Sequence, residues 1–256
     1  MKHFVKHVKT ILLAAMVAIA GNAAAAEPVE LFSFHTNIYA EQGISNLFSI
    51  LINTDKDMLL YVDCGAGADV YELEALTDTL IYCSVNEQGN VVVSGESAED
   101  AAAINYLNAE GCYIESIDLT RLTNLDVLNL SHNVLKDIDL SHNDSLRAIY
   151  ISDNTFTKET PLVIGNKPKL VILEMQIVDW LDPDFDLTKY PNLGSFDAYH
   201  CPTLTKIDPT NCPNLLQLTL EMTNVSTVDV SKNPNLLILN ISETAVKEID
   251  LTHNKK

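Results

Sequence analysis

Three acidic side chains recur along the C-terminal half of the sequence at nearly equal intervals. Glu174, Asp197 and Glu221 follow one another with almost the same separation along the chain. Carboxylates that a repeating chain brings together can divide acid and base roles, as in glycoside hydrolysis, or bind a cationic group on a partner. Two tyrosines, Tyr150 and Tyr199, recur in the same region. These residues form one site if the chain folds with the same period.

The sequence contains no established catalytic motif. It has no Gly-x-Ser-x-Gly elbow, no His-Glu-x-x-His motif and no spaced set of cysteines and histidines. Asp182, Asp184 and Asp186 have the spacing of a calcium loop, but Leu187 stands where that loop needs glycine. We therefore expect no enzymatic activity, no metal and no cofactor. Glycoside hydrolysis by the recurring carboxylates is kept only as the third alternative.

An internal repeat extends from residue 104 to the C-terminus. In residues 125–145, leucines stand at steps 0, 3, 5 and 15, and an asparagine stands at step 8. One such unit cannot bury its own apolar side chains, so successive units must stack around a shared core. Seven starting points, with successive separations of 21, 21, 24, 23, 22 and 21 along the chain, follow this pattern: Ile104, Leu125, Leu146, Leu170, Leu193, Leu215 and Leu236.

The pattern L-x-x-L-x-L-x-x-N/C-x-L resembles the leucine-rich repeat, and its Ile-Asp-Leu-Ser turns look like those of exported leucine-rich repeat proteins of Bacteroidetes. The resemblance implies a solenoid of about seven turns with a concave parallel sheet, a fold classified as α/β. Turns this short leave little room for an outer helix, and residues 138–140, 228–230 and 249–251 have an extended pattern there, so we expect mostly β structure. The resemblance also implies a ladder of small side chains at step 8, which would include Cys112 and Cys201.

Alternation along each short strand predicts which side chains leave the core. Steps 3 and 5 point inward, so steps 4 and 6 point outward. Step 4 contains Asn108, Asn129, Tyr150, Glu174, Asp197, Thr219 and Asn240, and step 6 contains Glu110, Ser131, Ser152, Gln176, Tyr199, Glu221 and Ser242. Neither column contains a lysine or an arginine. The predicted binding residues are Asn129, Tyr150, Glu174, Asp197, Tyr199 and Glu221, with His132 and His200 at step 7 extending the patch.

Tyrosines with carboxylates favour a protein partner that has a basic surface, so a protein-binding module is the leading hypothesis. A cell-surface protein that binds glycans or acts as an adhesin is the alternative. The insertion at residues 157–169 is the next candidate binding position, although it also fits a tolerated loop.

The N-terminal part of the sequence does not follow the repeat. Residues 1–26 combine three lysines, an apolar run and small residues, which is typical of a cleaved signal peptide. We therefore expect a periplasmic, extracellular or cell-surface protein without a membrane span. Residues 27–100 contain candidate strands at 47–53, 58–63, 79–85 and 90–94 and a hairpin turn at 86–89. They predict a small β-rich cap on a repeat domain of residues 101–256.

Charge and cysteine content restrict the possible partners further. Removal of residues 1–26 changes the formal charge from −19 to −22, because three lysines and no acidic residues are lost. Such a chain repels nucleic acids and anionic membranes. Five cysteines without a Cys-x-x-Cys pair indicate at least one free, buried thiol.

We expect the C-terminal end of the repeat to be uncapped. Apolar residues of the last turn are expected to form an uncovered edge that favours self-association: Leu236, Leu239, Ile241, Val246, Ile249 and Leu251.

Overall fold

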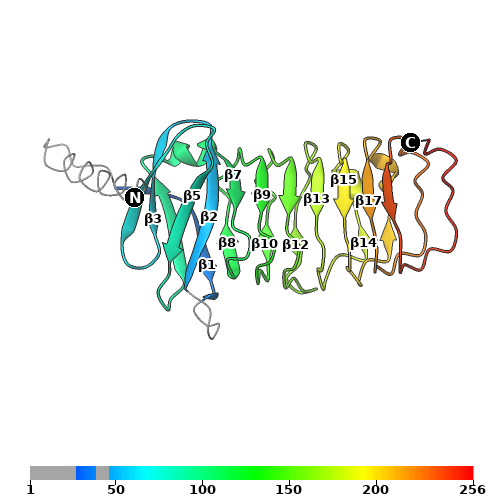
Figure 1. Cartoon of the computed structure of the whole chain (residues 1–256), viewed down its shortest axis with the longest axis horizontal. Coiled ribbons are helices and arrows are strands. Elements are labelled where there is room, and N and C mark those ends of the chain that lie inside the picture. Colours follow the sequence, from blue (N-terminus) through cyan, green and yellow to red (C-terminus); the bar gives the residue numbers. More distant parts are fainter. Residues whose placement is uncertain (1–26, 39–45, 256) are drawn as a thin grey trace, which may run out of the picture.

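The computed structural model describes residues 27–38 and 46–255, and the signal peptide predicted at residues 1–26 lies outside them. The described chain is elongated (Figure 1). A unit of longer strands forms its N-terminal end, and a row of stacked turns extends from this unit to the C-terminal end. The sequence-based division after residue 100 falls within η2 (Ala98–Ala103), a short 3-10 helix.

The N-terminal cap is built from six strands shared between two sheets. They are β1 (Val29–Thr36), β2 (Leu47–Thr54), β3 (Met58–Asp63), β4 (Ala68–Leu73), β5 (Thr79–Ser84) and β6 (Asn90–Gly95). The four strands predicted here are confirmed to within one residue at each end, whereas β1 and β4 were not predicted. The turn at 86–89 is confirmed by a bond of 3.0 Å from Gly89 N–H to the Asn86 carbonyl. Its assignment as a hairpin is wrong, because β5 and β6 belong to different sheets.

A nine-stranded sheet runs through the described molecule. Each predicted starting point precedes or begins one of seven parallel strands: β7 (Ile104–Asn108), β9 (Val127–Asn129), β11 (Ala148–Tyr150), β13 (Ile172–Glu174), β15 (Ser195–Asp197), β17 (Gln217–Thr219) and β18 (Ile238–Asn240). At the cap, β2 pairs antiparallel with β7, and β5 pairs with β2. We call the outward side of this sheet the strand face. The mostly β solenoid expected from the sequence is confirmed.

The opposite side of each turn is less regular. Strand β8 (Ile114–Asp118) pairs with β1 and joins the second sheet of the cap. Two short parallel pairs follow, β10 (Ile138–Asp139) with β12 (Leu162–Val163) and β14 (Asp184–Phe185) with β16 (Lys206–Ile207). Residues 228–230 and 249–251, expected to be extended, belong to no strand. The 3-10 helices η3 (Leu187–Lys189) and η4 (Pro209–Asn211) also lie on this side. Within the described residues, no helix is long and apolar enough to span a membrane.

The predicted ladder at step 8 is confirmed at Cys112, Asn133, Asn154 and Cys201, whereas Val178 interrupts it. The Asn133 amide donates to the carbonyls of Ala109 in the preceding turn and Leu130 in its own turn, at 2.9 Å each. The Cys201 thiol donates to the Met175 carbonyl of the preceding turn at 2.9 Å. These bonds satisfy buried carbonyls that the short strands leave unpaired, which fixes the stacking of one turn on the next.

A second ladder, which was not predicted from the sequence, lies three residues before the starting points from Leu146 onward. Asn143 and Asn233 each donate to carbonyls of the preceding turn, and the Cys212 thiol lies within 3.8 Å of two such carbonyls. Lys167 and Tyr190 occupy the same place in the longer turns. The sequence signal was an asparagine followed three residues later by leucine.

The cysteines separate into one disulfide and three buried thiols. Cys64, after β3, is bonded to Cys83 of β5 and so links the two sheets of the cap. Cys112, Cys201 and Cys212 are free and buried. The expectation of at least one free, buried thiol is confirmed.

The last turn is covered unevenly. Leu236 is buried, so its assignment to an uncovered edge is wrong. Leu239 and Ile241 pack against the core while remaining partly exposed. The exposed apolar side chains of this turn include Leu237 and Ile238, neither of which was predicted to be at the edge.

Candidate functional site

The strand face brings the predicted columns into register. Tyr150 of β11 pairs with Glu174 of β13, and Glu174 pairs with Asp197 of β15. Step 4 is therefore one continuous row across the seven parallel strands. The step-6 residues form a second row. Its members are held side by side by main-chain bonds from the following residue, such as His200 N–H to the Glu221 carbonyl at 2.9 Å, which places Tyr199 next to Glu221. Paired residues of adjacent strands lie about 4.8 Å apart, so the recurring acidic residues are neighbours.

Side chains at step 4 also shape the backbone after each strand. Asn129 Oδ1 accepts the N–H of Ser131 at 3.0 Å, and Asp197 Oδ1 accepts the N–H of Tyr199 at 2.9 Å. Asn108 and Asn240 make the same bond in their turns. This Asx turn leads into step 7, where the backbone is left-handed in every turn: Gly111, His132, Asp153, Ile177, His200, Met222 and Glu243.

Not all of the predicted site residues are equally available to a partner. Tyr150, Glu174 and Tyr199 are half-buried on the strand face, and no hydrogen bond engages their side chains within the described chain. Asp197 is only 8% exposed and also accepts from the Gln176 amide at 2.9 Å. Glu221 accepts from the Asn240 amide at 2.6 Å.

We call Tyr150, Glu174, Asp197, Tyr199 and Glu221 the central group. The remaining predicted site residues, Asn129, His132 and His200, lie outside it. Asn129 donates to Glu110 at 2.9 Å in addition to forming its Asx turn, so it stabilises the sheet. His200 lies beside Tyr199, with ring centroids 5.9 Å apart, and so adjoins the central group. His132 lies between Glu110 and Asp153, two turns before Glu174, and does not join this group.

Burial and repulsion from neighbouring carboxylates disfavour the charged forms of Glu174 and Asp197. Desolvation raises the pKa of Glu174, and the nearby Asp197 raises it further. Desolvation likewise raises the pKa of Asp197, and the charge of Glu221 raises it further. Hydrogen bonds from Tyr199 N–H and the Gln176 amide act in the opposite direction and lower it. Within the described residues, none of the three carboxylates forms an ion pair with a lysine or an arginine. The group therefore holds negative charge that the chain itself does not neutralise.

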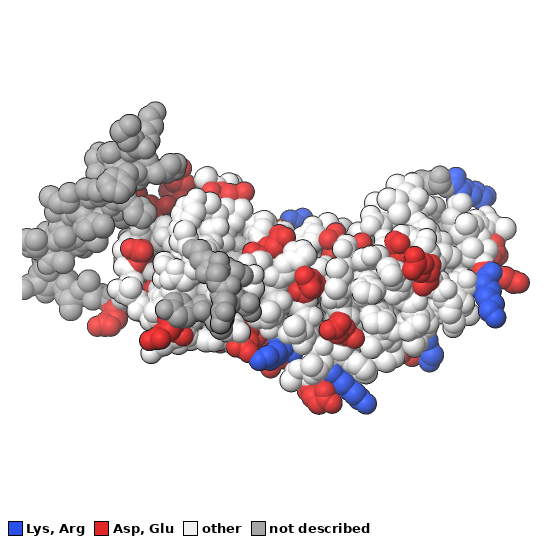
Figure 2. Space-filling view, turned by 60° about the horizontal axis from the view of Figure 1, so that its bottom comes forward, with Lys and Arg blue, Asp and Glu red and all other residues white. Residues whose placement is uncertain are grey.

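Several aspartates in the turns opposite the strand face have lowered pKa values. The backbone N–H and hydroxyl of Thr120 bond to Asp118 and lower its pKa. The same Asp-x-Ser/Thr bonds lower the pKa of Asp139, Asp186, Asp229 and Asp250. Acidic side chains are distributed along the body in Figure 2, while lysines and arginines lie mainly along one edge and at the C-terminal end. Among the acidic residues with resolved pKa shifts in the described part of the chain, Glu174 and Asp197 combine burial with a charge that no lysine or arginine balances.

A third outward column, which was not predicted from the sequence, lies at step 2. It contains Tyr106, Val127, Ala148, Ile172, Ser195, Gln217 and Ile238. Because each repeat strand includes steps 2 to 4, this column lies nearer the centre of the sheet than step 6 does. The same alternation that predicted steps 4 and 6 would have identified it. The cap extends the strand face with Leu51 of β2 and Leu80 and Tyr82 of β5.

Comparisons with known proteins bear on the fold. Neither protein-family models nor curated protein sequences match this chain. Among solved structures, the functional domain of InlJ from Listeria monocytogenes, described as including a cysteine ladder, has a TM-score of 0.55 at 21% identity. The match covers 66% of this chain and 40% of that one, so the chain spans less than half of that structure's length.

Two further solved structures have lower scores. Internalin C2 of the same species has a TM-score of 0.40 at 16% identity, with 67% of this chain and 84% of that chain covered. A leucine-rich repeat protein of Leptospira interrogans has a TM-score of 0.43 at 17% identity, with 52% and 35% covered. Together with the register of the parallel strands, the InlJ match shows that this chain has the leucine-rich repeat fold.

Proposed function

We propose that this protein is an exported, non-enzymatic binding protein that engages a protein partner with a basic surface on its strand face. The observation that carries the proposal is the acidic group of Glu174, Asp197 and Glu221, which is buried at Asp197, half-buried at the other two, and forms no ion pair with a lysine or arginine of the described chain. A partner's lysine or arginine placed there offsets both the repulsion among the carboxylates and their loss of solvent.

The neighbouring aromatic residues supply the apolar part of the interface. Tyr150 precedes Glu174 in the step-4 row, and Tyr199 stands beside Glu221 in the step-6 row. Tyrosine buries a large area with few rotatable bonds, so it is a common anchor of binding energy at interfaces. Two tyrosines around a charged centre fit a partner surface in which basic groups alternate with apolar ones.

Export is supported by two independent features. Residues 1–26 have the charge and apolar pattern of a signal peptide. The Cys64–Cys83 disulfide is a bond that persists in oxidising compartments and is rare in the cytosol.

The experiment begins with cross-linking and capture from surface and envelope fractions, followed by calorimetric titration of the purified partner. The test variant is Glu174→Gln/Asp197→Asn/Glu221→Gln, which removes three charges while preserving side-chain shape. Asparagine at 197 keeps the Asx turn, because Asn108, Asn129 and Asn240 form it elsewhere. We expect the affinity for the partner to fall at least about a hundredfold, since the loss of two charge pairs at about 1.5 kcal/mol each already corresponds to that factor.

The matched control is Asp208→Asn/Asp229→Asn/Asp250→Asn, which removes the same number of charges from the opposite turns. Each of these aspartates accepts the N–H two residues later, and asparagine can retain that bond. The control variant should bind the partner with an affinity close to that of the unmodified protein. If both variants lose affinity equally, net charge and not the strand-face group governs binding, and the site assignment is wrong.

A further inference from the structure

A shallow pocket of about 300 Å³ lies where the cap meets the repeat domain. It is lined by Asn53 of β2, Leu76 and Asp78 of the segment before β5, Asn105 and Tyr106 of β7, and Asp126 and Val127 at β9. The pocket therefore draws on both structural units, and none of its residues belongs to the acidic group at Glu174. Its volume is at the lower end of the usual range for ligand sites, about 300–1,000 Å³.

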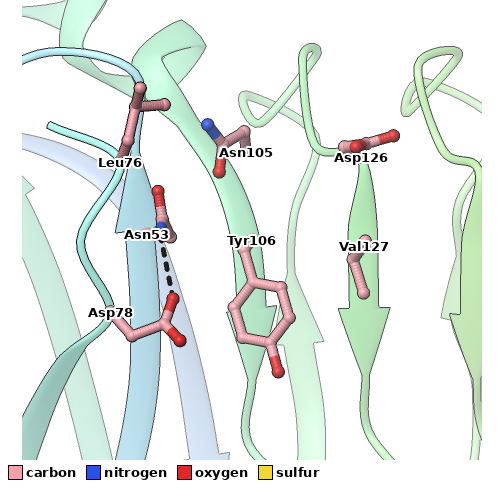
Figure 3. A pocket seen from close by; sticks show the side chains of 7 residues that line it. All are labelled: Asn53, Leu76, Asp78, Asn105, Tyr106, Asp126 and Val127. Carbon is pink, nitrogen blue, oxygen red and sulfur yellow. Dashed lines mark hydrogen bonds between the residues drawn. The ribbon is translucent and has the colours of Figure 1, made fainter.

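An aromatic ring provides one surface of this pocket. In Figure 3 the strands and the ring of Tyr106 are both seen face on, and Tyr106 lines the pocket as a partly exposed residue. Leu76, whose side chain is 76% exposed, and Val127 provide apolar contacts at two sides. An open aromatic face with apolar neighbours suits a ring-shaped ligand that has its own apolar face.

Hydrogen-bonding groups surround the ring, and the protein holds them in place. The Asn53 amide donates to Asp78 Oδ1 at 2.9 Å, which leaves the second carboxylate oxygen of Asp78 available (Figure 3). Asp126 is held by two bonds from the Arg147 guanidinium. The main chain fixes the spacing, because Asp126 N–H donates to the Asn105 carbonyl at 2.8 Å and Leu76 N–H donates to the Thr54 carbonyl at 2.7 Å.

The pairing of these groups favours a neutral ligand over a cation. Arg147 already compensates the charge of Asp126, and a bond from Asn53 partly satisfies Asp78. What remains is a set of fixed acceptors together with the amide of Asn105. Hydroxyl groups both donate and accept, so several hydroxyls on one ring can bond to the carboxylate oxygens and to the Asn105 amide together, whereas an ammonium or guanidinium group, which can only donate, leaves the Asn105 N–H groups without an acceptor.

We propose that this pocket binds one neutral pyranose ring of a glycan. The ring's apolar face stacks on Tyr106, and its hydroxyl groups bond to Asp78, Asn105 and Asp126. This activity goes beyond the protein-binding site and depends on different residues. A glycan site at the junction would let one exposed sheet recognise a sugar near the cap and a basic protein surface farther along.

The test is calorimetry and ligand-observed NMR of the purified protein with the methyl glycosides of glucose, galactose, mannose and N-acetylglucosamine. At least one should bind saturably in the millimolar range and shift the side-chain amide signals of Asn53 and Asn105. Tyr106→Ala should weaken binding about tenfold, the upper end of an aromatic contact's contribution. Tyr106→Phe should retain it, because the stacking face is kept.

Tyr82→Ala is the matched control, because Tyr82 is an exposed tyrosine of the same sheet outside the pocket. It should bind the sugar as the unmodified protein does, and so should the triple variant at Glu174, Asp197 and Glu221. Loss in that triple variant, or no saturable binding by any of the four glycosides, would overturn the proposal. The proposal would also be overturned if arginine amide bound and the sugars did not, with the affinity for arginine amide falling in Tyr106→Ala. The amide shifts of the unmodified protein locate the ligand even if Tyr106→Ala fails to fold.

Discussion

Lys167 is the clearest case in which one substitution should strengthen the fold. Its side chain is fully buried at a position of the second ladder where other turns place asparagine, cysteine or tyrosine. Nζ lies 3.5 Å from Asp144 Oδ1, and no hydrogen-bond acceptor in the described chain satisfies it. An ammonium group in this position loses its hydration and gains only one weak ion pair, so it should destabilise the folded state.

Lys167→Met keeps the length of the side chain and removes the buried charge. Replacement of buried ion pairs by apolar groups is neutral or stabilises by about 1–4 kcal/mol. Asp144 is 79% exposed, so it returns to solvent without becoming a buried, unpaired charge. Because the existing ion pair offsets part of the penalty, we expect a gain of about 1–2 kcal/mol in the free energy of unfolding, which corresponds to about 2–8 °C in Tm.

The pH dependence has a definite sign. Burial lowers the pKa of Lys167, so the unfolded chain binds this proton more tightly than the folded chain does. The stability of the unmodified protein should then rise with pH between the lowered pKa and about 10.4, the ordinary value for lysine. The advantage of Lys167→Met is therefore greatest at neutral pH and shrinks in alkaline buffer.

Urea denaturation followed by circular dichroism, at neutral and at alkaline pH, measures both effects. Lys169→Met, an exposed lysine of the same turn, is the control and should change stability by less than about 0.5 kcal/mol. An unchanged or lower midpoint for Lys167→Met at neutral pH would refute the inference that the buried ammonium is destabilising.

Three further predictions concern strain, thiols and export. Ile177 is a β-branched residue with φ of 55° at step 7, so Ile177→Asn should stabilise the fold by about 1 kcal/mol in the same denaturation assay, and a lower midpoint would contradict this. Burial raises the pKa of the Cys112 thiol to about 12 and those of Cys201 and Cys212 to about 11, so a thiol reagent at neutral pH should label them only after denaturant is added. Labelling of the native protein would show that the ladder opens. N-terminal sequencing of the protein from its native host should find Glu27 at or near the mature terminus, and a chain outside the cytoplasm that still begins at Met1 would exclude cleavage.

The repeat was predictable from sequence because its signal is redundant. Every turn repeats the apolar steps. The spacing of the starting points therefore predicts where the seven parallel strands lie and which step-4 residues pair with one another. The cap lacks such redundancy. Strand β1 is stabilised by pairing with β6 and β8, both distant from it along the chain, and no local pattern encodes that pairing. The pocket beside Tyr106 was missed for the same reason, since its lining residues come from four separate segments.

Asp197 illustrates a different limit of sequence analysis. Its column was predicted correctly, but its two roles were not separable without coordinates. The carboxylate supplies charge to the strand face and also forms the Asx turn to Tyr199. Removal of the whole side chain would therefore alter the backbone as well as the charge, which is why asparagine and not alanine is the informative replacement at this position.

The same turn divides the step-4 residues into those whose side chains shape the backbone and those whose side chains do not. Asn108, Asn129, Asp197 and Asn240 all accept the N–H two residues later, whereas Tyr150, Glu174 and Thr219 make no such bond. In the turn of Glu174, the hydroxyl of Ser152 in the preceding turn accepts the Gln176 N–H at 3.0 Å instead. A local rule is thus broken at Glu174, and a neighbouring turn compensates for the loss. The side chains of Tyr150 and Glu174 are therefore not needed to shape this turn, which agrees with the proposal that they serve binding.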